Sequence, residues 1–390
     1  MWDVAVIGAG LSGIVCARRL VSAGYSVCIL DKSRGVGGRM ATRRVGDRIR
    51  VDHGLRYWQP KSEELRSLTA DLLSAGVLKP WTASEYEIHE PGKLTQVEAS
   101  APKYVTQTGM SAIAKYLLAH PQDHAQGRQT TEQTAEPPAF ERGKTLLTEH
   151  RAVSIHPREG GWRIACETGE VVMAKRCAIA IPAEQAATLL TSSLSTSGLA
   201  DGPTPDHPTS DYPTSDLRRS LAEGIEALKA VSYFPSLTVL AGYDETYRTQ
   251  MNDLDPQGWM VSDYAGTSTD WVGLDSSKCS RTSTPVVVIH SRPEFAQRYL
   301  DTHDLQPAAS VLLRANARRL LDWIAQPEWF QIQRWRYAQV RSPHPQASLA
   351  ISDTLVCGGD WCIDSSADTT LESIDYAYLS GRSLADHLQH

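Results

Sequence analysis

The chain has 390 residues, of which 41% are hydrophobic and 22% charged, and its net charge at pH 7 is −6. This size and composition predict a soluble globular protein with one large or two ordinary domains. The sequence has no long basic stretch, which argues against a nucleic-acid partner. It also has no apolar run near the roughly 20 residues of a membrane span, so we expect no membrane association.

Cysteine usage and the N-terminus indicate the compartment. The seven cysteines are scattered, odd in number and free of CxxC pairs, which predicts reduced thiols in a reducing compartment. The apolar run from Val4 to Val15 is interrupted by glycines and lacks a basic n-region, so it does not read as a signal peptide. We therefore expect a cytoplasmic protein.

The first 30 residues predict a βαβ unit. Asp3–Gly8 is a near-continuous apolar run, typical of a buried parallel strand. Leu11–Ala23 has helical spacing, and Gly24 follows as a stop signal. Tyr25–Leu30 reads as the second strand.

The rest of the chain alternates predicted elements with two low-complexity insertions. We expect helices over 63–75, 111–119, 311–323 and about 371–387, and strands over 152–155, 162–167, 171–181, 237–243, 286–290, 331–340 and 355–358. The insertions cover about 121–144, which is rich in Gln, Thr, Glu and Pro, and about 191–216, which repeats Pro, Thr, Ser and Asp. Such compositions predict flexible surface segments.

The glycines of the first turn form a dinucleotide-binding pattern, Gly8-x-Gly10-x-x-Gly13. Gly8 permits the tight turn, Gly10 lets the backbone approach a pyrophosphate, and Gly13 allows close packing of helix and strand. The free N–H groups of the helix start, at Leu11 and Ser12, favour an anion. Asp31 lies 23 residues after Gly8, where its carboxylate can accept hydrogen bonds from a ribose, and Lys32 follows it.

A second glycine-rich motif, Gly35-Val36-Gly37-Gly38-Arg39-Met40, follows directly. Dehydrogenases that use NAD do not need such a loop, whereas many FAD oxidoreductases carry a GGR sequence here. The fork of donors on Arg39 can neutralise a phosphate, and we include Gly38 and Met40 in the same contact. The alternative is an ordinary glycine-rich surface turn.

A third motif, Cys357-Gly358-Gly359-Asp360-Trp361, lies near the other end of the chain. We expect close backbone approach at Gly359 and acceptance of a ribityl hydroxyl hydrogen bond by Asp360. The helix start at 372–374, including Ile374, can direct N–H groups at the flavin ring. Val153, on the strand predicted over 152–155, completes the expected contacts, and the three motifs imply one FAD domain split in sequence.

The chain resembles the renalase family, within the larger amine-oxidase-like FAD superfamily. The segments that carry the resemblance are GAGLSG (8–13), DKSRGVGGRM (31–40), VDHGLRYW (51–58), TGMSAIAKYL (108–117), KAVSY (229–233), VVVIH (286–290), RWRYAQV (334–340), CGGDWC (357–362) and YLSG (378–381). It covers nearly the whole chain apart from the two insertions. One departure is Tyr376, which stands where relatives usually carry a small residue.

The resemblance implies a flavin oxidase that converts wrongly reduced, isomeric dihydronicotinamides to NAD(P)+ and passes the electrons to O2, giving H2O2. It also implies active-site roles for Tyr57, His290, Trp335 and Arg336, with Arg336 near the substrate phosphates. Taken alone, His290 at a strand end is more often a structural histidine, and Tyr57 is as well explained as a core aromatic. A dihydropyridine needs no protein base to give up hydride, which fits the scarcity of acid–base residues.

We therefore expect an α/β protein: a Rossmann-type FAD-binding domain from 1–58, 146–190 and 345–390, and a smaller mixed α+β substrate domain from 59–145 and 191–344. FAD should be bound non-covalently, although Cys357 or Cys362 could be imagined as a covalent link. No Cys/His spacing suggests a metal site. Two other functions stay open, oxidation of another small amine by the same flavin and a flavin-binding redox sensor without turnover.

Overall fold

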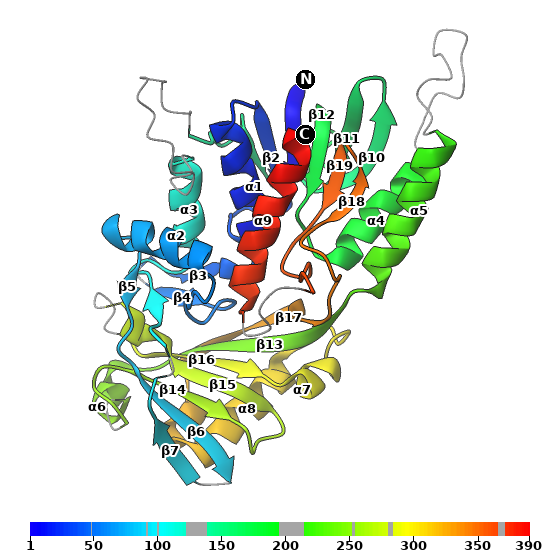
Figure 1. The fold of residues 1–390 in the computed structure, drawn as a ribbon. Helices are drawn as coiled ribbons and strands as arrows, with labels where there is room; N and C mark the ends of the chain where they lie inside the picture. The colour runs from blue at the N-terminus through cyan, green and yellow to red at the C-terminus, as the bar shows by residue number, and fades with distance from the viewer. Residues whose placement is uncertain are drawn as a thin grey trace.

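The computed structural model arranges the chain around two large β-sheets, one above the other in Figure 1. It describes residues 1–47, 49–90, 93–99, 101–121, 139–194, 214–251, 254–279, 284–365 and 371–390. None of the helices within these ranges is long and apolar enough to cross a membrane.

The first sheet is built around β1 (Trp2–Ile7), whose residues Val4, Ala5 and Val6 are fully buried. Its other strands are β2 (Val27–Asp31), β9 (Leu146–Thr148), β10 (Ala152–Arg158), β11 (Gly161–Cys166), β12 (Val171–Ile179), β18 (Leu349–Ser352) and β19 (Leu355–Cys357). In space, β9, β2, β1, β12 and β19 are neighbours and parallel. The loops after β1, β2 and β19 therefore leave the same edge, where open α/β sheets bind ligands.

Helices cover both faces of this sheet. On one face α1 (Leu11–Ser22) packs against α9 (Ser373–Gln389), and α2 (Glu63–Ser74) and α3 (Ser111–Ala119) join the same hydrophobic core. On the other face lie α4 (Ala183–Leu194) and α5 (Ser215–Ala230). The alternation of β1 explains the division, because Val4 and Val6 enter the first core and Ala5 and Ile7 the second.

The packing of three helices differs from the domain limits expected from the sequence, which stay a prediction. The helices α2, α3 and α5 fall within 59–145 and 191–344, which we had assigned to the substrate domain. Their apolar side chains, such as Leu65, Ile113 and Leu221, are instead buried against the first sheet. More of the chain therefore packs around the first sheet than the motifs alone suggested.

The second sheet has the spatial order β17-β13-β16-β15-β14-β6-β7. Its strands are β6 (Ser84–Glu90), β7 (Lys93–Val97), β13 (Ser232–Gly242), β14 (Trp259–Asp263), β15 (Thr269–Leu274), β16 (Val286–Ser291) and β17 (Trp329–Ser342). All neighbours are antiparallel except β14 and β6. The long strands β13 and β17 run beneath the first sheet in Figure 1.

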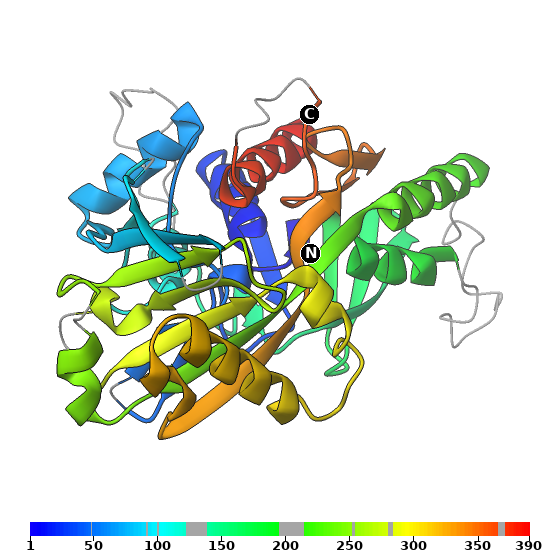
Figure 2. The ribbon, with the colours of Figure 1, turned by 90° about the horizontal axis from the view of Figure 1, so that it is seen from below.

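The two faces of the second sheet have different neighbours. The outer face packs on α7 (Pro293–Gln297), α8 (Gln306–Arg319) and the 3-10 helix η6 (Asp322–Ala325). In Figure 2 these helices, yellow to orange, lie in front of the sheet. The inner face carries Leu240, Met260 and Val288, which pack with Val51 and Trp81 from outside the sheet.

Short elements connect the two layers. They are η1 (Gly38–Met40), β3 (Thr42–Val45), β4 (Ile49–Asp52), β5 (Lys79–Pro80), β8 (Tyr104–Val105), η4 (Glu245–Tyr247), α6 (Arg248–Met251) and η5 (Asp275–Lys278). The strands β3 and β4 form an antiparallel hairpin, and β5 pairs with β8.

The expected α/β class and N-terminal βαβ unit are confirmed. The helix predicted over 311–323 begins earlier, at Gln306 with a proline in its first turn, and ends at Arg319. Most of the two low-complexity insertions, 122–138 and 195–213, lies outside the described residues. The ends of the second insertion are helical, because α4 continues to Leu194 and α5 begins at Ser215.

Candidate functional site

The three glycines of the first loop have distinct structural roles. Gly8 has φ of +111°, and a Cβ there would lie 2.4 Å from the Ala180 carbonyl oxygen. A Cβ on Gly13 would lie 1.9 Å from the Gly8 oxygen. Around Gly10, in contrast, a Cβ would meet nothing within 4 Å. The helix α1 starts beside this open space without a side-chain cap or an acidic first turn, as an anion site requires.

Asp31 lies at the end of β2 beside this loop. Its carboxylate accepts hydrogen bonds from the backbone N–H groups of Ala9 and Ser33, both at 2.7 Å. Backbone bonds from residues 149 and 150 to residues 33 and 31 bring the start of β10 to the same place. Val153 follows there with its side chain 47% exposed, at an irregularity in the pairing of β10. Lys32 donates to the Gln185 amide oxygen at 3.0 Å.

Arg39 and Asp360, expected to contact different parts of the cofactor, contact each other. The guanidinium donates two parallel hydrogen bonds to the carboxylate, at 2.6 and 2.5 Å. Ser373 donates a third bond to Asp360 at 3.0 Å. Arg39 also reaches the Tyr337 carbonyl at 3.4 Å, which links this pair to β17. Gly38 next to it has φ of +55° and would place a Cβ 3.3 Å from Gly10 Cα, and Met40 is buried in the core of the first sheet.

The start of α9 is fixed by a buried carboxylate. Asp375 is fully buried and accepts from the backbone N–H groups of Lys61 and Ser62 and from the Ser62 hydroxyl, at 3.0, 2.7 and 2.8 Å. It also forms a capping box with Glu372. These contacts hold the first turn of α9, with Ile374, against the segment that leads into α2. Figure 1 shows this end of α9 directed toward β13 and β17.

Cross-strand register places two of the predicted catalytic residues on the inner face of the second sheet. One row across neighbouring strands contains Gln333, Thr238, His290, Trp271 and Ser262, each opposite the next. Trp271 packs with Leu240, Met260 and Val288 on the inner face of the sheet. The whole row therefore faces inward. Trp335 lies two residues beyond Gln333 on the same strand.

Aromatic contacts connect this row to the segment after β4. Trp335 stacks on His53 with ring centroids 5.3 Å apart, and its Nε1 donates to the His53 carbonyl at 2.7 Å. Tyr57 also belongs to the inner-face cluster and lies 6.3 Å from the Trp81 ring. The fold therefore brings Tyr57, His290 and Trp335 to one surface, and their active-site roles stay a prediction.

Arg336 does not join them. Its guanidinium donates to Asp301 at 2.8 Å and to the Leu300 carbonyl at 3.2 Å. Arg334 reaches the same loop. Because side chains alternate along a strand, the neighbours of Trp335 point away from the inner face. This placement does not support the expected role of Arg336 beside the substrate phosphates, which stays a prediction.

Four buried polar atoms on this surface have no hydrogen-bond partner within the described chain. They are His53 Nδ1, Thr238 Oγ1, Trp271 Nε1 and His290 Nε2. Their residues are at most 8% exposed. Buried polar groups are normally paired, and unpaired ones mark a place for a ligand or water. The sequence analysis did not single out His53, Thr238 or Trp271, because only the cross-strand register places the last two beside His290.

Burial, with a smaller effect of nearby cations, sets the protonation states on this surface. Burial, followed by Arg43, lowers the pKa of His53 to about 4, and burial with Arg56, Lys278 and His53 lowers the pKa of His290 well below its usual value. Both imidazoles are therefore neutral at pH 7 and can donate or accept one hydrogen bond each. Burial also raises the pKa of Tyr57, which keeps its hydroxyl protonated.

Lys278 is a further residue that the sequence analysis missed. Its ammonium is 4% exposed and lies 2.6 Å from Asp275 and 3.4 Å from Asp52. It also lies 5.4 Å from the centre of the Trp81 ring. Asp52 in turn precedes His53, so this ionic cluster fixes the start of the segment that carries His53 and Tyr57.

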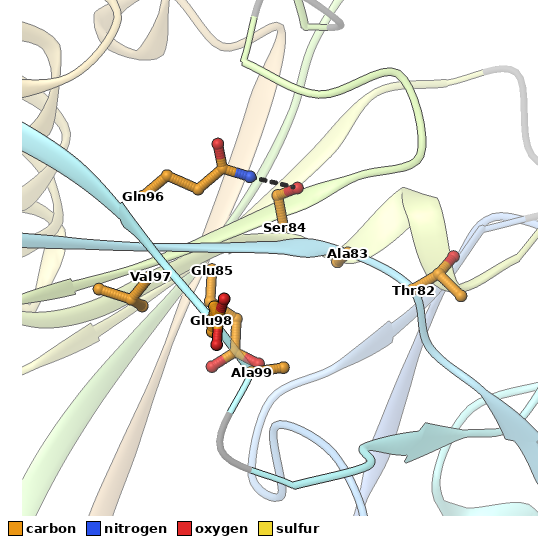
Figure 3. Close-up of a pocket in the computed structure, with 8 residues that line it drawn as sticks. All are labelled: Thr82, Ala83, Ser84, Glu85, Gln96, Val97, Glu98 and Ala99. Atoms are coloured by element: carbon orange, nitrogen blue, oxygen red, sulfur yellow. Dashed lines mark hydrogen bonds between the residues drawn. The ribbon is translucent and has the colours of Figure 1, made fainter.

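An open cavity of about 430 Å³ is lined by the residues around the start of β6 and the end of β7 (Figure 3). Ser84, Glu85, Gln96 and Glu98 are among its lining residues, and Gln96 donates to Ser84 at 3.3 Å. Glu85 is already paired with Lys103 at 2.5 Å. The unpaired buried atoms lie elsewhere, so we place the candidate site at the inner-face row and not in this depression.

Cysteines and metal ligands offer little chemistry in the described parts of the chain. Cys357 and Cys362 are buried, and burial raises the pKa of both thiols, so neither supplies a thiolate for a flavin link. Within these parts no group of three or more His, Cys, Asp and Glu side chains could hold a metal ion.

The residues at the edge of the first sheet fit a dinucleotide cofactor. The open space at Gly10 is the cradle that a side chain would fill, and the uncapped start of α1 faces it. Asp31 lies at the end of β2, Arg39 lies in the loop after β2, and its partner Asp360 lies in the loop after β19. The inner face of the second sheet is in contact with this edge, since a Cβ on Gly54 would meet both the Arg39 carbonyl at 2.0 Å and Trp335 at 3.3 Å.

Comparison with known proteins agrees with this fold. Residues 6–72 match the family model of the NAD(P)-binding Rossmann-like domain. A putrescine oxidase of Kocuria rosea is 39% identical over 70 residues, which are 18% of this chain and 14% of that protein. The chain thus matches only a small part of this curated relative's length.

Solved structures extend the likeness to the whole chain. A putrescine oxidase bound to putrescine has a TM-score of 0.63 at 13% identity, covering 100% of this chain and 99% of that one. A cyclohexylamine oxidase of Brevibacterium oxydans has a TM-score of 0.62 at 12% identity and covers 100% of both chains. A putative protoporphyrinogen oxidase of Exiguobacterium has a TM-score of 0.64 at 12% identity and covers 99% of both. The fold is like that of the flavin amine oxidases.

Replacing Gly10 tests the cofactor cradle. We expect Gly10→Val to yield folded protein without the yellow flavin spectrum, because the added side chain fills the space that the phosphates need. Gly35→Val is the matched control, since a Cβ at Gly35 also meets nothing within 4 Å. The control should keep its flavin. A full flavin absorbance in purified Gly10→Val would contradict the assignment.

The lowered pKa of His53 predicts an acid-sensitive fold. Between pH 6.5 and about 4 the unfolded chain binds a proton on this residue that the folded chain does not. The contribution of His53 to the free energy of unfolding is therefore fully present above pH 6.5. It falls as the pH drops, by about 1.4 kcal/mol per pH unit for each such proton. His290 acts in the same direction. His53→Phe, which keeps a ring against Trp335, should flatten the dependence measured by urea unfolding by about one proton, whereas Trp335→Phe should leave the slope unchanged. Equal slopes in the wild type and His53→Phe would contradict the burial argument.

Proposed function

We propose that the protein is an FAD-dependent oxidase that removes a hydride from a small molecule bound at the inner face of the second sheet. Electrons would pass to O2, giving H2O2. The observation that supports this proposal is the contact between the Gly10 cradle and a surface with four unpartnered buried polar atoms. A redox enzyme of this kind needs a held cofactor and an oriented substrate.

When bound, the flavin would supply the hydride acceptor and the path to oxygen. The chain's own residues bind and orient. Gly10 and the start of α1 accommodate the phosphates, Asp31 the ribose, and the Gly359–Asp360 turn the ribityl chain. Trp335 and Tyr57 present ring surfaces to a flat substrate, and His290 and Thr238 offer hydrogen bonds from a wall that excludes water. Because Cys357 and Cys362 are buried and protonated, we propose non-covalent FAD.

The first candidate substrate is a small amine. The structural neighbours named for putrescine and cyclohexylamine support it. Hydride leaves an amine only in its neutral form, and the burial that keeps His53 and His290 uncharged also disfavours an ammonium ion here. An amine substrate would therefore have to lose its proton before reaction.

The second candidate is an isomeric dihydronicotinamide, as in the renalase family. One observation favours it, namely that the buried inner-face row carries neutral imidazoles, which suit an uncharged ring. Such a substrate gives up hydride without deprotonation. A redox sensor without turnover is the third possibility and predicts slow reduction by either class.

Anaerobic mixing of the flavin-loaded protein with a panel of amines and dihydronicotinamide isomers distinguishes these candidates. We expect the flavin absorbance to bleach with one class. The bleaching rate should rise steeply with pH toward the amine's pKa for an amine, and should be nearly flat across neutral pH for a dihydronicotinamide.

His290→Ala and Tyr57→Phe should slow this bleaching by up to ~100-fold through loss of substrate orientation, with flavin content unchanged. Arg336→Gln is the control and should react at the wild-type rate, because its side chain faces Asp301. No bleaching by any member of the panel would contradict the oxidase proposal.

A further inference from the structure

The β3–β4 hairpin carries two arginines in an unfavourable arrangement. Arg44 on β3 is directly opposite Arg50 on β4 in the antiparallel pair. Directly opposite residues project from the same face of a sheet, and like charges in that position destabilise the pair. An anion bound between the two guanidinium groups would compensate this repulsion.

A third cation lies on the same face. The neighbouring pair Thr42 and Asp52 holds the start of α3, because Asp52 accepts from Met110 N at 2.8 Å and Thr42 accepts from Ser111 N at 3.1 Å. Lys115 lies one helical turn after Ser111, on the same side of α3. Lys115 therefore lies over the next residue pair of the hairpin, which is Arg44 with Arg50. Burial, together with these two arginines, lowers the pKa of Lys115.

These three cations have no acidic partner. Within the described parts of the chain, no carboxylate lies within ion-pair distance of Arg44, Arg50 or Lys115, although the chain has 45 acidic residues for 39 basic ones. Arg44 and Lys115 are exposed and Arg50 is half-buried, whereas the buried Lys278 is paired with Asp275, and Arg319 with Asp263. Arg50 donates instead to the Ile49 carbonyl at 2.9 Å, which restrains its guanidinium.

We propose that Arg44, Arg50 and Lys115 bind a phosphate group of a small phosphorylated molecule. Guanidinium forks match phosphate oxygens in pairs, and a lysine adds a point charge. Three cations held at one place by a hairpin and a helix suit a single compact dianion better than a membrane, which needs a broad basic surface.

This phosphate site is distinct from the cofactor cradle. Arg43, on the opposite face of the hairpin, donates to Gln331 at 3.0 Å on the second sheet and lies near His53. The face with Arg44 and Arg50 turns away from that surface toward α3. The proposal therefore goes beyond the oxidase activity and does not depend on it.

The test uses the flavin-loaded protein, so that the phosphate loop at Gly10 is filled, and inorganic pyrophosphate as the probe. Calorimetric titration at low ionic strength should show saturable binding to the wild type. Arg44→Gln with Arg50→Gln should weaken it at least about tenfold, and Lys115→Gln alone should weaken it in the same direction. Arg314→Gln, at an exposed position on α8, is the matched control and should bind as the wild type does.

Thermal unfolding gives a second readout. Without pyrophosphate, the double variant should melt above the wild type, because the opposed charges are relieved, and added pyrophosphate should raise the melting temperature of the wild type alone. Chloride at equal ionic strength controls for screening. Equal pyrophosphate affinity in all variants, or no saturable binding to the wild type, would overturn the proposal. Binding to phosphatidylglycerol vesicles through these residues without pyrophosphate binding would also overturn it.

Discussion

The arrangement of the site depends on the ion pair between Arg39 and Asp360, which lie 321 positions apart in the sequence. The Asp360 side chain is 1% exposed and that of Arg39 is 35% exposed. A carboxylate so deeply buried is stable only with an opposite charge and hydrogen bonds, which Arg39 and Ser373 supply. The pair thereby joins the loop after β2, the loop after β19 and the start of α9 at one edge of the first sheet.

That edge determines where a cofactor and a substrate can meet. Parallel strands send their loops to a common side, and the glycines at 8, 10 and 13 leave open space only at Gly10. The second sheet closes the other side with a row of side chains whose polar atoms are unpaired. Buried donors and neutral imidazoles give this surface hydrogen-bonding groups but no strong base, as the proposed flavin chemistry requires.

The sequence predicted the parts of this arrangement that depend on local pattern. The βαβ unit, the glycine loop and the strands of 171–181 and 286–290 follow from short-range periodicity and turn chemistry, and the structure contains them. The assembly of Tyr57, His290 and Trp335 on one surface followed from resemblance, because no spacing in the chain links residues on three separate segments.

The remainder depends on tertiary contacts that sequence patterns do not reveal. Arg39 and Asp360 each looked like a separate cofactor contact, since nothing in either motif indicates a partner at the other end of the chain. Arg336 lies on the face of β17 opposite Trp335, and the alternation of the strand did not show which face turns inward. Lys278 lies in a short 3-10 helix without a motif, and its role became visible only through its contacts with Asp52 and Asp275.

A double-mutant cycle on Arg39 and Asp360, read by the free energy of urea unfolding, tests this account most directly. Arg39→Gln leaves a buried carboxylate without its cation and should cost about 3 kcal/mol or more, whereas Asp360→Asn should cost less because Arg39 can reach water. The double variant should be more stable than Arg39→Gln alone, which gives a large coupling energy. Additive effects, with Arg39→Gln no worse than Asp360→Asn, would contradict the claim that this pair holds the two ends of the chain together at the site.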